Sequence, residues 1–263
     1  MKSKKLLSII LALAMVFSVL PASTVLVYAD EITETISADT IWNDGDTVGG
    51  ITISGGTVTI NGNVGITAAI TIKGDVTFTG GGTLNRMSTS GNLIKVESGS
   101  LTLNNVTIDG TNVTISDSWT AAAINMADGT VIMNDGAKIT NHKRTSGYGP
   151  AVYMAGGNFK MKGGTISGCE TSEYGGAVYL YGGSFEMNNG TVENNKTTTS
   201  TKYGGGAFYV RGATLTINGG LIQNNSSDCG GAIYNSAYGT TIINGGVIKN
   251  NTAVGTRQNG AAI

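Results

Sequence analysis

Apolar and polar residues alternate along most of this chain in short runs that glycine or asparagine separates. Residues 57–60 and 76–78, for example, place an apolar side chain at every second position. This period of two, with many β-branched residues, predicts short β-strands. Asn61-Gly62 and the glycines at 55–56 and 80–82 are predicted to mark the turns between strands. No stretch beyond residue 29 favours a helix.

From residue 91 the strands recur in a fixed order. One motif occurs four times, at 150–154 (PAVYM), 176–180 (GAVYL), 206–210 (GAFYV) and 231–235 (GAIYN). The repeats are anchored at nearly regular intervals on Leu93, Ala123, Ala151, Ala177, Ala207, Ala232 and Ala261. Because the length varies mainly in the segment before each anchor, the repeat predicts a solenoid with one variable loop side.

Aligning the repeats predicts three strands in each rung, where a rung is one complete turn of the solenoid. Each strand contributes a column of inward residues, one from each rung. A column of the first strand is Ile94, Ile124, Val152, Val178, Phe208 and Ile233. One of the second strand is Leu101, Val131, Phe159, Phe185, Leu215 and Thr241, and that of the third is Ile108, Ile139, Ile166, Val192, Ile222 and Ile248. Apolar residues that stack in columns predict an all-β fold, a parallel β-helix that rises ~4.8 Å per rung. Each rung depends on its neighbours for burial.

The chain is predicted to contain three regions. Residues 1–29 have the basic start, apolar run and small residues of a secretory signal peptide. The alternative is a membrane anchor, but the apolar run is shorter than the ~20 residues that span a bilayer. Residues 30–90 are predicted to form an N-terminal cap and a solenoid with short rungs, and residues 91–263 the regular rungs. Because 260–263 begin another rung, we expect a longer natural protein.

Composition and charge narrow the range of partners. Only 13% of the residues are charged and 40% are hydrophobic, which excludes a disordered chain. Removing residues 1–29 leaves 13 basic and 17 acidic side chains, a net charge of −4. This charge argues against nucleic acid as a partner. We also expect no membrane span after cleavage of the signal peptide.

Two sets of polar residues are predicted to be structural. Asn195, Asn225 and Asn251 align after the third strand, in one column with His142 and Cys169. Stacked amides at such a turn can hydrogen-bond along the solenoid axis. Cys169 and Cys229 fall at different corners, almost two rungs apart. The axial offset of roughly 7–10 Å is too long for a disulfide, so we predict none.

Residues 175–179 (GGAVY), 205–209 (GGAFY) and 230–234 (GGAIY) resemble the repeats of the pectin-lyase-like superfamily. More narrowly, they resemble adhesin-like repeats of secreted Gram-positive surface proteins. They are also similar to repeats of the chlamydial polymorphic membrane proteins, although an aliphatic residue here replaces a phenylalanine of those repeats. The resemblance covers about residues 91–263. It implies a right-handed parallel β-helix in a secreted or cell-surface bacterial protein.

The outward column of the first strand supplies the candidate binding site. It contains Tyr153, Tyr179, Tyr209 and Tyr234, with Arg211 on the same face. Exposed rings with polar tips can stack on sugars. We therefore predict an adhesin-like protein that contacts a polysaccharide, a host or cell-surface glycan, or another surface without catalysis. The alternative is a cross-strand ladder that stabilises the sheet beneath the variable loops.

We predict no catalytic residue, metal site or cofactor from the sequence. The acidic residues do not gather in one outward column, and His142 is the only histidine. A threonine face of the ice-binding kind would be interrupted by Lys160 and Glu186. Two alternatives stay open. One is a polysaccharide lyase or glycoside hydrolase, which the resemblance implies, with its active residues in loops or beyond residue 263. The other is a passive structural stalk.

Overall fold

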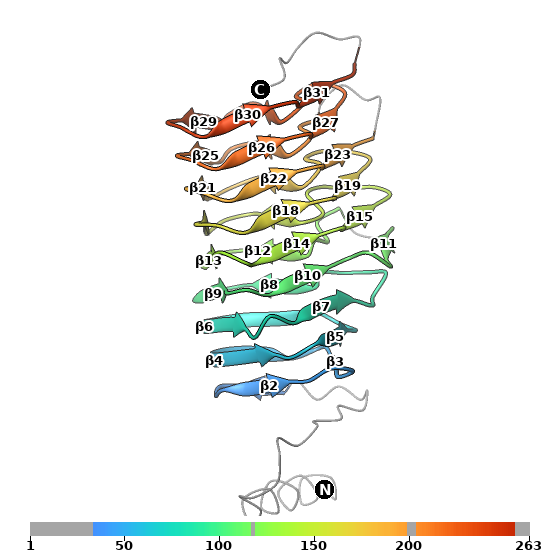
Figure 1. Ribbon diagram of the computed structural model, residues 1–263, viewed down its shortest axis with the longest axis vertical. Helices are drawn as coiled ribbons and strands as arrows, with labels where there is room; N and C mark the ends of the chain where they lie inside the picture. Colours follow the sequence, from blue (N-terminus) through green and yellow to red (C-terminus); the bar gives the residue numbers. More distant parts are fainter. Residues whose placement is uncertain (1–33, 117–118, 199–203, 256–263) are drawn as a thin grey trace, which may run out of the picture.

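The computed structural model describes residues 34–116, 119–198 and 204–255. The predicted signal peptide and the anchor Ala261 lie outside these residues. The described chain consists of strands and connecting loops without a helix, and the strands stack in parallel as three sheets of a β-solenoid (Figure 1). The predicted all-β parallel solenoid is confirmed. No described helix is long and apolar enough to cross a bilayer.

The N-terminal part of the solenoid has short rungs. Its strands are β1 (Thr35–Ile36), β2 (Thr40–Trp42), β3 (Thr47–Val48), β4 (Thr52–Ile60), β5 (Asn63–Ile66), β6 (Ile70–Thr79) and β7 (Thr83–Arg86). Strands β1 and β2 both pair with β4, and β3 pairs with β5, so residues 35–48 form the first rung. Val64 pairs with Leu84, and the interval between these two positions is the length of one short rung.

From β8 onward, each rung contains four short strands. The first-strand column is β8 (Ile94–Val96), β12 (Ile124–Met126), β16 (Val152–Met154), β20 (Val178–Leu180), β24 (Phe208–Val210) and β28 (Ile233–Asn235). The second is β9 (Ser100–Leu103), β13 (Thr130–Met133), β17 (Asn158–Met161), β21 (Ser184–Met187), β25 (Thr214–Ile217) and β29 (Thr240–Ile243).

The third column is β10 (Thr107–Asp109), β14 (Lys138–Thr140), β18 (Thr165–Ser167), β22 (Thr191–Glu193), β26 (Leu221–Gln223) and β30 (Val247–Lys249). The fourth is β11 (Thr114–Ile115), β15 (Lys143–Arg144), β19 (Glu170–Thr171), β23 (Lys196–Thr197), β27 (Ser226–Ser227) and β31 (Thr252–Ala253). This fourth column forms its own six-stranded sheet, which the sequence did not predict. A two-residue strand is too short to show a period of two.

The predicted register is confirmed in all three predicted columns. Ile124 pairs with Ile94 and Val152, Val131 pairs with Leu101 and Phe159, and Ile139 pairs with Ile108 and Ile166. The later rungs continue the same pairings to β28, β29 and β30. The inward side chains form one continuous apolar core, which includes the stacked rings of Phe159 and Phe185, 4.6 Å apart between centroids.

The long strands β4 and β6 correct the prediction of a turn at Gly55 and Gly56. Gly55 and Gly56 do not end a strand but lie within β4, at a register shift against β6. Gly56 has a φ of +93°, so it supplies the backbone conformation of a bulge. Strand β6 then pairs with both β8 and β9, and in this way the first and second columns belong to a single sheet.

The repeated Gly-Gly-Ala motif has a steric cause. A Cβ atom at Gly175 would collide with the carbonyl of Val178 in the strand that follows. A Cβ atom at Gly176 would collide with the carbonyl of Gly206 in the next rung. In these rungs the backbone packs closely against itself where the first strand begins, and glycine avoids the collision. In two earlier rungs, Ala122 and Pro150 occupy the position of Gly176.

The predicted asparagine ladder is confirmed as a buried structural element. The Oδ1 atom of Asn225 accepts from the backbone N–H and the Nδ2 of Asn195, both at 3.0 Å, and Asn251 binds Asn225 in the same way. Each amide also donates to a carbonyl of the preceding rung, as Asn225 does to Val192 at 3.0 Å. Cys169 begins this ladder by donating its N–H to Asn195. Cys169 and Cys229 are both buried and form no disulfide, as predicted.

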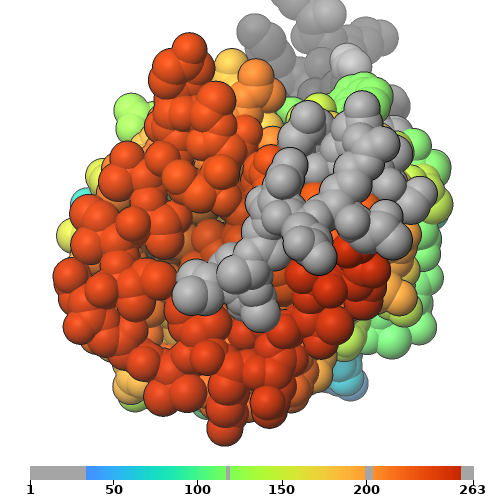
Figure 2. Space-filling view, turned by 90° about the horizontal axis from the view of Figure 1, so that it is seen from above, coloured from blue at the N-terminus to red at the C-terminus, as the bar shows by residue number. Residues whose placement is uncertain are grey.

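The last described rung is less covered than the others. Ile243 continues an inward column, yet 47% of its surface is exposed, and Val247 is 51% exposed. In the end-on view of Figure 2, residues of this rung lie on the end of the stack. No described rung stacks above Ile243, whereas its equivalent Ile217 lies between two described rungs and is 1% exposed.

Candidate functional site

The predicted outward column is a row of stacked tyrosines. The ring centroids of Tyr153 and Tyr179 are 5.6 Å apart, those of Tyr179 and Tyr209 are 5.1 Å apart, and those of Tyr209 and Tyr234 are 5.2 Å apart. The angles between ring planes are 2°, 7° and 17°. This geometry follows from the parallel register, which places equivalent residues of successive rungs directly above one another.

The two central tyrosines are not exposed, which corrects the expectation of an open row of rings. Tyr179 is 2% exposed and Tyr209 is 6% exposed, whereas Tyr153 and Tyr234 at the ends are half-buried. Tyr179 is therefore held between two neighbours of its own column. The shielding predicted by the alternative interpretation applies to the centre of the row.

A second row of aromatic residues covers this centre. Tyr148 stacks on Tyr179 with a centroid distance of 4.6 Å, and Tyr174 lies 5.0 Å from Tyr209. Tyr148 and Tyr174 are themselves 5.3 Å apart, and Trp119 extends the row 5.7 Å beyond Tyr148. Together the two rows enclose the rings of Tyr179 and Tyr209.

Backbone contacts hold this second row in place. Tyr148 and Tyr174 form a parallel β-bridge, and the N–H of Tyr148 donates to the carbonyl of Trp119 at 3.0 Å. The buried side chain of Arg144 donates to the carbonyl of Tyr148 at 3.0 Å and to that of Ala121. The period of two did not single out these residues. A sequence pattern could nevertheless have identified them, because Tyr148 and Tyr174 each lie three positions before a repeat anchor, Ala151 and Ala177.

The outer edge of this cluster is exposed. Trp119 is 57% exposed and Tyr181 is 52% exposed, and the side chain of Arg211 is also exposed. Tyr181 and Arg211 occupy equivalent positions in neighbouring rungs, just after β20 and β24. We call Trp119, Tyr181 and Arg211 the rim of the aromatic cluster. The rim differs from the predicted site, of which it retains only Arg211.

Arg211 is tied to the buried centre. Its side chain hydrogen-bonds to the hydroxyl of Tyr179, and its guanidinium carbon lies 5.6 Å from the ring centroid of Tyr181. Burial raises the pKa of Tyr179 to about 12, although the hydrogen bond from Arg211 opposes that shift. The phenol of Tyr179 is therefore neutral at physiological pH and serves as a fixed acceptor for Arg211.

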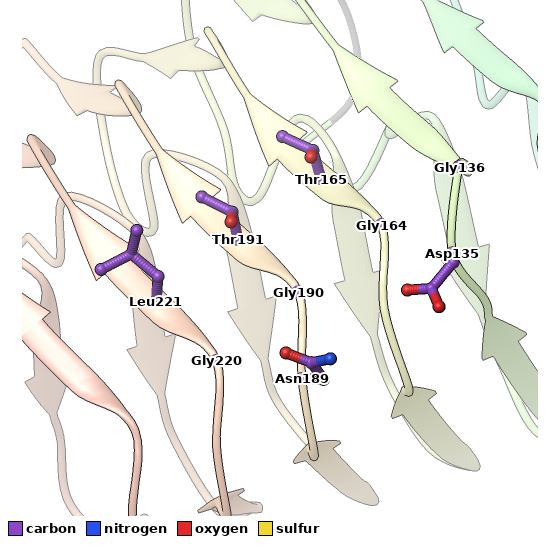
Figure 3. A pocket seen from close by; sticks show the side chains of 9 residues that line it. All are labelled: Asp135, Gly136, Gly164, Thr165, Asn189, Gly190, Thr191, Gly220 and Leu221. Carbon is purple, nitrogen blue, oxygen red and sulfur yellow. The ribbon is translucent and has the colours of Figure 1, made fainter.

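A concave feature runs along the corner between the second and third strands. This open groove of about 580 Å³ is lined by Asp135, Gly136, Gly164, Thr165, Asn189, Gly190, Thr191, Gly220 and Leu221. Figure 3 shows Thr165, Thr191 and Leu221 on successive strands, with Asp135 and Asn189 in the turns. Its glycines have positive φ angles, for example +92° at Gly190. They are explained by the turn itself, which requires that backbone conformation.

In the described part of the chain, no three His, Cys, Asp or Glu side chains gather in a way that could hold a metal ion. Burial lowers the pKa of His142 to about 3, and the nearby charge of Arg86 acts in the same direction. Burial alone would raise the pKa of Asp109, but hydrogen bonds donated by Asn141, Thr111 and Thr140 outweigh it and lower the pKa. Both residues serve the turns in which they lie.

Comparison with known proteins adds no relative to this description. No protein-family model matches the chain, and no curated protein or solved structure matches it significantly.

Proposed function

We propose that this protein is a secreted or cell-surface bacterial protein that binds carbohydrate through its aromatic cluster, without catalysis. The observation that carries the proposal is the exposed rim above a rigid aromatic base. Trp119 and Tyr181 are each more than half exposed, and sugar rings stack on exposed aromatic rings. The hydroxyl and guanidinium groups beside them can bind sugar hydroxyls.

The stacked centre has a supporting role in this proposal. Tyr179 and Tyr209 are buried, so a glycan contacts the rim and the half-buried Tyr148 and Tyr153 rather than these two rings. Rings fixed by stacking lose little conformational entropy when a ligand binds. A ladder of this kind provides a preorganised surface on a stiff solenoid. The proposal also agrees with the resemblance of the repeats to those of adhesin-like Gram-positive surface proteins and of the pectin-lyase-like superfamily.

A glycan-binding screen of the purified protein tests this function. Trp119→Ala and Tyr181→Ala should each weaken binding by about 5- to 10-fold, since each removes one stacking face. Tyr238 is 95% exposed and lies in the last described rung, between β28 and β29 and outside the cluster. Tyr238→Ala is therefore the matched control and should bind like the wild type.

Three results would contradict the proposal. One is an absence of glycan binding in the whole screen. The second is binding that both rim variants retain in full. The third is release of cleaved product from a bound polysaccharide, which would favour a lyase or hydrolase.

A further inference from the structure

Arg211 carries a positive charge that the described residues do not neutralise. No described carboxylate forms an ion pair with Arg211, whereas Lys73 and Glu97 pair at 3.3 Å elsewhere on the solenoid. The residues that influence Arg211 electrostatically are the tyrosines Tyr179, Tyr181 and Tyr209. The rim therefore presents one cation beside neutral aromatic side chains. The carboxylate of Glu173 acts on Tyr148 of the same cluster, but it does not pair with Arg211.

The guanidinium group is also oriented by its surroundings. The hydroxyl of Tyr179 accepts a hydrogen bond from it, and the ring of Tyr181 lies beneath it at 5.6 Å. Tyr179 cannot move freely, because the rings of Tyr148, Tyr153 and Tyr209 stack against it. A guanidinium has five N–H donors, and the bond to Tyr179 leaves others for a ligand in solvent.

We propose that the rim selects sugars that carry an anionic group, with Arg211 as the specificity-determining residue. This inference rests on the proposed function. A planar guanidinium binds a carboxylate or a sulfate through two parallel hydrogen bonds. The rings of Tyr181 and Trp119 would then stack on the sugar that carries the group. The shared chemistry is a sugar-borne anion, which a uronic acid or a sulfated sugar supplies.

The test compares three soluble polysaccharides: a neutral hexose polymer, a uronic acid polymer and a sulfated hexose polymer. Binding of the purified wild type is measured beside Arg211→Gln, Arg211→Lys and Lys95→Gln. Lys95 is the matched control, because it is an exposed cation in the column of the outward tyrosines, two rungs before Tyr153 and outside the rim. Circular dichroism of each variant verifies that the exposed substitutions leave the fold intact.

We expect the wild type to bind at least one anionic polymer about 10-fold or more tightly than the neutral polymer. Arg211→Gln should reduce that affinity to the neutral level, and Arg211→Lys should lose part of it. Lys95→Gln should change neither the affinity for the anionic polymer nor that for the neutral polymer. Added salt should weaken the binding of the anionic polymer by the wild type. The two anionic polymers distinguish a carboxylate from a sulfate.

The outcomes separate this inference from the proposed function. Equal binding of neutral and anionic polymers, lost in Trp119→Ala, would overturn the anion selectivity and leave the carbohydrate function standing. An anionic preference that survives Arg211→Gln would overturn the role of Arg211. Binding of none of the three polymers, nor of any glycan in the screen, would overturn both.

Discussion

The short rungs of residues 34–90 and the long rungs of residues 91–255 share one core but carry different surfaces. In a short rung, Val64 pairs with Leu84. In the long rungs, Ile94 pairs with Ile124 and Phe208 pairs with Ile233, so each of these rungs contains more of the chain. Both kinds of rung bury their apolar columns. The solenoid core therefore does not require the additional residues.

The additional residues build everything that distinguishes the long rungs. They form the six-stranded sheet from β11 to β31, the asparagine ladder and the loops that place Trp119, Tyr148 and Tyr174 over the tyrosine row. The short rungs, as described, contain none of these features. The comparison indicates that the core sets the spacing and that the extra segment of each rung supplies the candidate binding surface.

The largest effect is expected from the buried ladder. Asn225→Ala removes the partner of the N–H and Nδ2 of Asn195 and one of the hydrogen bonds that the carbonyl of Val192 accepts. Because these groups are buried, the free energy of unfolding should fall by about 2–4 kcal/mol. Denaturant unfolding measures this loss.

An exposed amide ladder provides the control for that experiment. Asn218 donates to Asn188 at 2.9 Å and accepts from Asn244 at 2.7 Å, but these residues are exposed. Asn218→Ala should therefore change stability by no more than about 0.5 kcal/mol. Equal losses in the two variants would refute the claim that burial makes the inner ladder important.

The next effect concerns pH and His142, which continues the ladder column but is not an amide. Its Nε2 lies 3.3 Å from the carbonyl of Ile108, and its pKa is lowered to about 3 from 6.5. The neutral form is favoured in the fold, so the contribution of His142 to stability is complete above pH 6.5. This contribution is lost as the pH falls toward 3. Between pH 6.5 and pH 5, the free energy of unfolding should decrease by about 2 kcal/mol.

His142→Asn tests this assignment, because asparagine suits the column and does not titrate. The free energy of unfolding of the variant should stay constant between pH 6.5 and pH 5, whereas that of the wild type should decrease. Chemical unfolding at several pH values measures the difference. A variant that loses stability as steeply as the wild type would show that other groups cause the pH dependence.

A smaller effect is expected from Tyr179→Phe. This variant keeps the stacked ring but removes the hydroxyl that binds Arg211. Stability at pH 7 should fall by about 1 kcal/mol. Since the pKa of Tyr179 is raised from 10.0 to about 12, the neutral phenol favours folding below pH 10, and this contribution is lost between pH 10 and 12.

Ultraviolet titration of the two proteins checks that pH range. The absorbance step near pH 12 should be present in the wild type and absent in Tyr179→Phe. If the two titrations coincide, Tyr179 is not held in the neutral, buried position described above.

The sequence predicted the parts of the structure that have a clear period. The columns led by Ile94, Leu101 and Ile108 could be aligned because alternation fixes which side chains point inward. The bulge at Gly55 and Gly56 was misassigned because bulges and turns use the same residue type. The outward tyrosine column was found, but its burial was not, since Tyr148 and Tyr174 lie in a segment without periodicity.

The central claim is that the extra segments of the long rungs form a glycan-binding surface on a core that the short rungs share. Hydrogen–deuterium exchange of the protein with and without a glycan from the screen tests it most directly. We predict that the glycan slows exchange in peptides that contain Trp119, Tyr148, Tyr181 and Arg211, and leaves residues 34–90 unchanged. Protection confined to residues 34–90, or to the groove at Asn189 and Thr191, would contradict the account.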